Sequence, residues 1–221
     1  ELSAMLAEIT PPQFEMFFLG SSGSDSNDTI LRMARTYWDI MGKPDKKTVI
    51  SRRNAYHGSS VAGASLGGMA GMHAPSGLPI PGIVHIAQPY WFGEGMPMDP
   101  PMSEDEFGVW AARQLERAID EIGDDKVAAF IAEPIQGAGG VIIPPATYWP
   151  EVKRILDERE ILFISDEVIC GFGRTGRWFG CETYGTEPDF MAMAKGIASG
   201  YQPLGAVAVS KRVAEAFHEK K

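Results

Sequence analysis

Cysteine and positively charged side chains are both scarce in this sequence. Its 221 residues include only two cysteines, Cys170 and Cys181, whose spacing matches neither a zinc signature nor a disulfide framework. We therefore expect a cytoplasmic location and no metal site. Lys and Arg number 20 against 29 Asp and Glu, a formal net charge of -9. Such an acidic chain is not expected to bind nucleic acid or anionic membranes through a general surface.

Several sequence patterns that define other protein classes are also missing. We find no apolar run long enough to span a bilayer, no secretory signal and no internal repeat. No expected strand runs directly into GxGxxG with a later acidic residue, since GFGRTG begins only at Gly171, beyond the expected strand 161–167; this argues against a nicotinamide-dependent dehydrogenase. With 44% hydrophobic and 22% charged residues, the composition is ordinary for a globular protein. The chain opens on Glu1 without a starting Met and stops at FHEKK, so we expect it to be part of a longer polypeptide.

Short apolar runs alternate with helical patterns, which is typical of βα units and a mostly parallel sheet flanked by helices. Helical spacing runs through DTILRMARTYWDIM. A second helix should open at Ser103 and Glu106, which have capping-box spacing, and a third at Thr147 as its N-cap. The expected strands are 16–19, 47–51, 82–86, 127–133, 161–167, 189–194 and 204–210.

Three of these strands run into polar residues at their carboxyl ends. VAAFIA is followed by Glu133, ILFIS by Asp166 and Glu167, and DFMAMA by Lys195. Ligands of open α/β sheets bind beyond the carboxyl ends of the strands. We therefore expect Glu133, Asp166 and Lys195 to converge on one ligand, although each of them taken alone could be an ordinary solvated strand end.

The stretch GSSGSDSNDTILRMA leads from a strand through small residues into a helix. The small side chains of Ser22, Gly23 and Ser24 let a ligand approach the backbone, and the helix N-terminus suits a phosphate. In RNAYHGSS, Tyr56 and His57 follow another strand, where an aromatic ring can stack on a flat ligand. Each motif alone is equally compatible with a simple helix cap or a packed loop.

One lysine, Lys195, lies inside the apolar stretch PDFMAMAKGIASG. Burying a lysine there is costly unless its amine is used, so we expect a buried, reactive amine in apolar surroundings. A phosphate cradle, a stacking aromatic ring, a strand-end aspartate and such a lysine together suit pyridoxal 5'-phosphate. The lysine forms an imine with the cofactor, and Asp166 keeps the pyridine nitrogen protonated.

On six motifs the sequence resembles the class III aminotransferases of the pyridoxal-phosphate fold-type I superfamily. Within them it is similar to ω-transaminases that act on amines or β-alanine with pyruvate as acceptor. The fold implied is α/β, with a mostly parallel sheet between helices, an αβα sandwich. The motifs are SSGSDSNDT, YHGSS, GASLGGM, AAFIAEPIQGAGGVIIPPATYWPE, SDEVICGFGRTGRWFG and AKGIASGYQPLGA.

The resemblance assigns a role to each candidate residue. Lys195 is implied to be the imine lysine and proton shuttle, and Asp166 the partner of the ring nitrogen. Val168 is implied to pack on the ring face opposite Tyr56, and His57 to support Tyr56 and the pocket. The phosphate would be held by Ser22, Gly23 and Ser24. Glu133 would lie near the Asp166 side of the ring, with Gln136 and Ala138 close to the cofactor, and Arg174 and Arg177 would be structural or interface residues.

The resemblance also implies how the chain is organised. Residues 1–221 would form one large cofactor-binding domain, without the N-terminal segment and the C-terminal small domain of the family. The partner-subunit threonine at the phosphate and the arginine for acidic substrates would lie outside it. The implied partners are an amine donor, a keto acid acceptor and a second copy in a homodimer. Two alternatives stay open: another class III enzyme, such as an aminomutase or decarboxylase, or an inactive truncated chain that keeps the fold.

Overall fold

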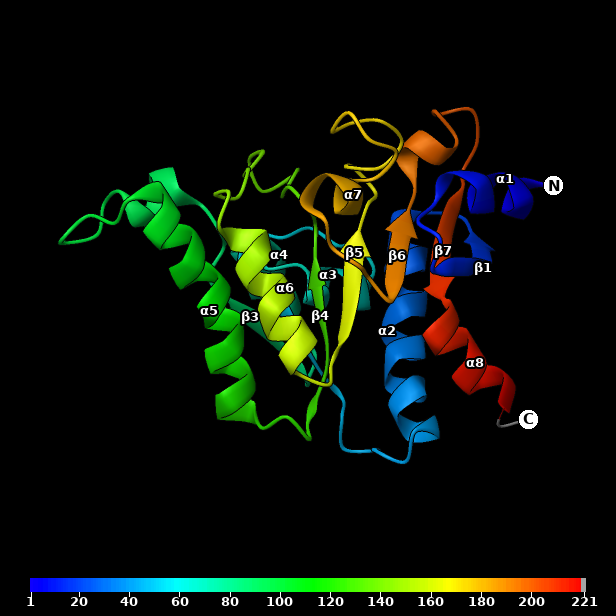
Figure 1. Cartoon of the computed structure of the whole chain (residues 1–221), viewed down its shortest axis with the longest axis horizontal. Coiled ribbons are helices and arrows are strands. Elements are labelled where there is room, and N and C mark those ends of the chain that lie inside the picture. The colour runs from blue at the N-terminus through cyan, green and yellow to red at the C-terminus, as the bar shows by residue number, and fades with distance from the viewer. Residues whose placement is uncertain (220–221) are drawn as a thin grey trace.

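The computed structural model describes residues 1–219 and contains a seven-stranded sheet (Figure 1). The strand order is β1-β7-β6-β5-β4-β2-β3. The pairs β2–β3, β2–β4, β4–β5 and β5–β6 are parallel, and β7 is antiparallel to both β1 and β6. The strands are β1 (Phe14–Gly20), β2 (Thr48–Arg52), β3 (Ile83–Ile86), β4 (Val127–Ala132), β5 (Leu162–Asp166), β6 (Phe190–Met193) and β7 (Gly205–Ser210).

All seven strands expected from the sequence are present, with ends shifted by one or two residues. Helices cover both faces of the sheet, so the predicted αβα sandwich is confirmed. The helices are α1 (Leu2–Ile9), α2 (Gly23–Ile40), α3 (Val61–Leu66), α4 (Ala70–His73), α5 (Glu104–Ile122), α6 (Tyr148–Glu158), α7 (Gly180–Tyr184) and α8 (Lys211–Glu219), with short turns η1 (Ala74–Ser76), η2 (Trp91–Gly95) and η3 (Lys195–Ile197).

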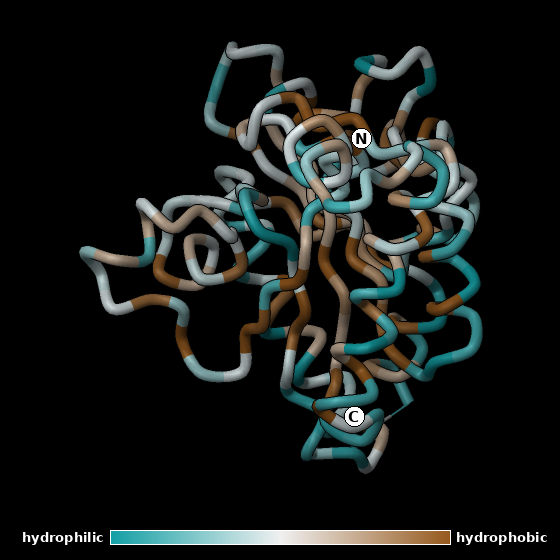
Figure 2. Tube along the Cα trace, turned by 90° about the vertical axis from the view of Figure 1, so that its left-hand side faces the viewer, coloured by the Kyte–Doolittle hydropathy of each residue, from teal (hydrophilic) through white to brown (hydrophobic). Residues whose placement is uncertain are grey.

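The alternation of side chains along each strand sorts the core into two layers. On β4, Ala129 and Ile131 pack with α2, α3 and α8, whereas Phe130 and Ala132 pack with α5 and α6. On β6, Met193 faces α1 and α7. Figure 2 shows hydrophobic strands in the middle of the molecule and mainly hydrophilic stretches on the outer helices and loops. Every residue of β4, β5, β6 and β7 is buried, so the core lies along these four neighbouring strands.

Side-chain caps begin two of the long helices, and one of the two caps expected from the sequence is present. The Ser22 side chain accepts a hydrogen bond from Asp25 N at the start of α2, and Ser103 and Glu106 form the predicted capping box of α5. Thr147 precedes α6 as expected but makes no capping bond, because its hydroxyl donates to the carbonyl of Asp105 at 2.7 Å.

No helix within residues 1–219 is both long and apolar enough to cross a membrane.

Candidate functional site

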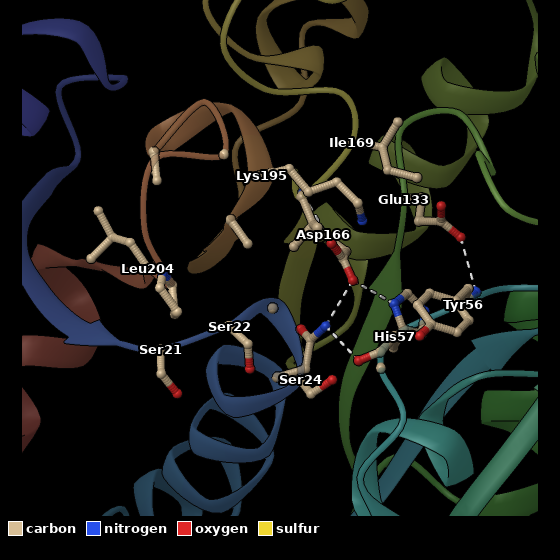
Figure 3. Close-up of a pocket in the computed structure, with 18 of the residues that line it drawn as sticks. Ser21, Ser22, Ser24, Tyr56, His57, Glu133, Asp166, Ile169, Lys195 and Leu204 are labelled. Carbon is tan, nitrogen blue, oxygen red and sulfur yellow. Dashed lines mark hydrogen bonds and ion pairs between the residues drawn. The ribbon is translucent and has the colours of Figure 1, made fainter.

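A cavity of about 300 Å³ lies at the carboxyl edge of the sheet, where β4, β5 and β6 end and α2 begins (Figure 3). It is the place where the βα connections of a parallel sheet leave room for a ligand. All nine candidate residues line it, although they come from five separate segments of the chain. They are Ser22, Gly23, Ser24, Tyr56, His57, Glu133, Asp166, Val168 and Lys195.

The first turn of α2 forms one end of the cavity. The Ser22 hydroxyl caps this helix, and the Ser24 hydroxyl accepts a hydrogen bond from Ser59 N at 3.1 Å. The first N–H groups of a helix have no partner within it, so this turn can hold an anionic group. Gly58 lets the Tyr56–His57 loop approach: its φ is 132°, and a Cβ there would lie 2.6 Å from Ser24 Oγ.

Tyr56 and Glu133 form a second wall. Tyr56 is half-buried, and its backbone N–H donates to Glu133 Oε1 at 3.1 Å. Glu133 Oε2 accepts from Gly137 N at 2.8 Å, so both carboxylate oxygens hold loop backbone in place. Burial raises the pKa of Glu133, with the nearby charge of Asp166 adding to the effect and His57 opposing it. Glu133 thus shapes the loops on both sides of the cavity.

Asp166 is held by three hydrogen bonds at the end of β5. Its Oδ2 accepts from Asn27 Nδ2 and faces His57 Nδ1, both at 2.8 Å, and its Oδ1 accepts from Val168 N at 3.1 Å. His57, which the resemblance implied to support Tyr56 and the pocket, contacts Asp166 in the cavity. Asn27 was missed from the sequence. The signal for it was its position one helical turn after Gly23, on the same face of α2.

Lys195 follows β6 by two residues, in the turn η3, with φ of 47°. Its side chain is exposed, so the prediction of a buried lysine is wrong for this structure. The reason is that burial ends with Ala194: the backbone then turns, and Lys195 lies at the open rim of the cavity. Figure 3 shows its amine pointing into the cavity, towards the space between Asp166 and Glu133. Within residues 1–219, no hydrogen bond or ion pair engages this amine.

The whole chain, residues 1–221, matches the protein family Aminotransferase class-III. The chain belongs to the class III aminotransferases. It is 58% identical over 219 residues to putrescine–pyruvate aminotransferase of Pseudomonas aeruginosa, covering 99% of this chain and 47% of that protein. It is also 44% identical to diaminobutyrate–2-oxoglutarate transaminase of Halomonas elongata, covering 99% and 46%.

Solved structures of transaminases share the fold of this class III aminotransferase chain. The ω-transaminase of Pseudomonas jessenii in complex with PMP superposes with a TM-score of 0.94 at 42% identity, covering 99% of this chain and 48% of that one. An (S)-enantioselective ω-transaminase of Thermomicrobium roseum gives 0.92 at 43% identity, covering 100% and 48%. The chain thus spans about half the length of the relatives it matches.

Four further residues named from the class III resemblance lie away from the cavity wall. Gln136 is buried and donates to the carbonyl of Arg53 at 3.0 Å, and Ala138 is exposed on the same loop. Arg174 and Arg177 are exposed on the loop before α7. The structure therefore brings together the nine main candidates but does not place these four among the residues that line the cavity.

Proposed function

We propose that residues 1–221 form the large cofactor-binding domain of a pyridoxal-phosphate-dependent transaminase. One observation carries this proposal: a single cavity combines the N-terminus of α2, the carboxylate of Asp166 and the amine of Lys195. The helix N-terminus suits a phosphate, the carboxylate suits a protonated ring nitrogen, and the amine suits an aldehyde. Pyridoxal 5'-phosphate carries all three of these partners.

The shape of the cavity supports this cofactor. A Cβ on Gly23 would lie 2.9 Å from Val168 Cγ2, so only glycine lets the first turn of α2 pack this closely against Val168. Val168 and Tyr56 both line the cavity and offer apolar and aromatic surfaces to a flat ring. Asp166 Oδ1 accepts one hydrogen bond from the chain and keeps room for another.

Each residue of the cavity has its own role in the proposed reaction. When bound, the cofactor supplies an aldehyde that takes up an amino group and a ring that accepts electrons from the donor carbon. Lys195 would hold the cofactor covalently until the amine donor takes its place, and the freed Lys195 amine would then move a proton at the donor carbon. Asp166 would accept the ring N–H, and Ser22, Gly23 and Ser24 would bind the phosphate. Tyr56 and Val168 would pack against the ring and so orient it relative to Asp166.

The substrates we propose are a primary amine or ω-amino acid as donor and pyruvate as acceptor. Support comes from the 58% identity to a putrescine–pyruvate aminotransferase and from the structural likeness to ω-transaminases. The test is to assay the chain with putrescine or β-alanine and pyruvate, with 2-oxoglutarate as a competing acceptor. Alanine formed from pyruvate supports the proposal. Release of carbon dioxide, isomerised product or no product at all would favour the other class III reactions or an inactive chain.

Replacing Lys195 by Ala tests the proposed site directly. With pyridoxal 5'-phosphate, the wild-type chain is expected to show absorbance near the visible edge, and borohydride should then attach the cofactor to Lys195, as mass spectrometry of peptides can show. Lys195→Ala should lose both signals and transamination. Lys126→Ala is the matched control, because Lys126 is exposed at the opposite edge of the sheet, just before β4. Covalent labelling of Lys195→Ala equal to wild type would refute the assignment.

We further propose that two copies of the chain associate and that the protein works in the cytoplasm. Large apolar side chains are exposed around the carboxyl edge of the sheet, among them Phe92, Val141, Trp178 and Tyr201. Both cysteines are free and buried, which suits a reducing compartment. Light scattering over a range of chain concentrations measures the association, and a constant monomer mass would contradict it.

A further inference from the structure

The two carboxylate oxygens of Asp166 accept different numbers of hydrogen bonds from the chain. A carboxylate oxygen has two lone pairs. Both lone pairs of Oδ2 are engaged, by Asn27 Nδ2 and His57 Nδ1, whereas Oδ1 accepts only the N–H of Val168. The one acceptor position that Asp166 keeps for a ligand is therefore on Oδ1. We infer that Asn27 is a positioning residue that, together with His57, holds Asp166 so that Oδ1 receives the ring N–H of the cofactor. This inference rests on the proposed function.

The Asn27 amide is committed to this arrangement. Its side chain is buried, with 1% exposed, and Nδ2 donates to the carbonyl of His57 at 2.9 Å as well as to Asp166. Both amide protons are thus used on acceptors. A flipped amide would place its oxygen against two other oxygens, so the orientation follows from the partners. The side-chain oxygen of Asn27 has no hydrogen-bond partner within residues 1–219. This is unfavourable for a buried group, but it leaves both amide N–H groups able to donate.

His57 must also act as a donor in this network. The ring is buried, with 1% exposed, and Nε2 finds no partner within the described part of the chain. A proton on Nε2 would be buried without an acceptor, which is unfavourable. The ring therefore carries its proton on Nδ1, which donates to Asp166 Oδ2. Asp166 receives hydrogen bonds from three donors, and none of its neighbours competes for the free position on Oδ1.

Removal of the Asn27 N–H donor should make the orientation of the Asp166 carboxylate less fixed. One lone pair of Oδ2 becomes free, and the carboxylate can rotate or offer either oxygen to the ring nitrogen. A hydrogen bond to a charged group corresponds to a rate change of about ten- to a hundredfold. We expect Asn27→Leu, which keeps the approximate volume and removes the donor, to lower kcat by this factor. The KM for the amine donor should change by about twofold or less, because both N–H groups of Asn27 are already engaged by Asp166 and by the carbonyl of His57.

Two measurements test the inference. In the chain without cofactor, ¹⁵N NMR of labelled histidine should show His57 protonated on Nδ1 and bare on Nε2, with His57→Gln to assign the signal. In the loaded chain, ¹⁵N-labelled cofactor should report a protonated ring nitrogen in wild type and a partly deprotonated one in Asn27→Leu. Ser26→Ala is the matched control: it removes a hydroxyl of similar burial on the same turn of α2, which donates to Ser22 O at 3.0 Å outside the network.

Each outcome decides the matter. A proton on Nε2 of His57 in wild type overturns the network even if Asn27→Leu does not fold. A wild-type ring-nitrogen signal and kcat in Asn27→Leu overturn the role of Asn27 while the proposed function stands, provided that wild type binds the cofactor at Lys195. If wild type takes up no cofactor, the proposed function fails and this inference fails with it.

Discussion

Asp166 and Glu167 are neighbours in the sequence, but their carboxylates lie in different surroundings. Asp166 lines the cavity, whereas Glu167 accepts hydrogen bonds from Gly180 N at 2.8 Å and Cys181 N at 2.7 Å at the start of α7. Burial raises the pKa of Glu167 to about 7, although the two N–H groups and Ser165 oppose the shift. At the scale of the residue, one carboxylate is available to a ligand and the other ties α7 to the end of β5.

The raised pKa of Glu167 predicts a pH dependence of stability. The folded chain keeps this proton up to about pH 7, whereas the unfolded chain releases it near 4.5. The free energy of unfolding is therefore expected to fall as pH rises through this window. The part of this fall that is due to Glu167 is on the order of 3 kcal/mol at most. Urea unfolding from pH 5 to 8 should show a smaller decline for Glu167→Gln than for wild type.

Other groups contribute in the same direction and need a control. Burial also raises the pKa values of Glu133 and Asp189. Both residues are present in wild type and in Glu167→Gln, so the difference between the two slopes isolates Glu167. Identical slopes would contradict the raised pKa.

At the scale of the element, the long helices α2 and α5 start with the same kind of cap, but only the start of α2 contributes to the cavity. Both α2 and α5 begin after a serine whose side chain accepts a hydrogen bond from the third residue of the helix. Only Ser22 lines the cavity, whereas Ser103 is exposed at another part of the surface. A helix N-terminus becomes a binding site only where the fold directs it at a cavity.

This pair of serines gives a matched experiment. Ser22→Ala and Ser103→Ala should each lower the free energy of unfolding by about 1 kcal/mol, because each removes one N-cap. Only Ser22→Ala should also weaken binding of pyridoxal 5'-phosphate, as measured by titration. Equal cofactor affinity in both variants would show that the Ser22 hydroxyl does not contribute to phosphate binding.

At the scale of the whole molecule, the cavity joins segments that lie far apart in the chain. The start of α2, the loop after β2 and the ends of β4, β5 and β6 all contribute to it. A ligand bound to all of these segments opposes the unfolding of the entire sheet, because it binds the folded state alone. Cofactor binding should therefore be visible in global stability as well as in spectra.

Addition of pyridoxal 5'-phosphate at about 100 times its dissociation constant is expected to raise the free energy of unfolding by about 2.7 kcal/mol. Pyridoxal at the same concentration is the control ligand, because it lacks the phosphate and should stabilise the chain much less. Urea denaturation with each ligand measures both effects. An unchanged midpoint with pyridoxal 5'-phosphate, or equal shifts with both ligands, would count against the proposed site.

The elements were predictable from the sequence because their signals are local. The run VAAFIAE predicted a buried strand over 127–133, and β4 spans Val127–Ala132. Ser103 and Glu106 predicted a capping box that is present. Local patterns did not predict that Thr147 would donate to Asp105 instead of capping α6, because that partner lies on a different helix.

Sequence by itself determined the strands, the starts of α5 and α6, the αβα class and the candidate residues at the strand ends, since apolar periodicity and side-chain type are properties of neighbouring residues. Tertiary structure alone decided that β7 runs antiparallel, that Lys195 lies at an open rim and that Asn27 and His57 meet at Asp166. These features depend on how the backbone leaves each strand and on contacts between residues over a hundred positions apart, which no local pattern encodes.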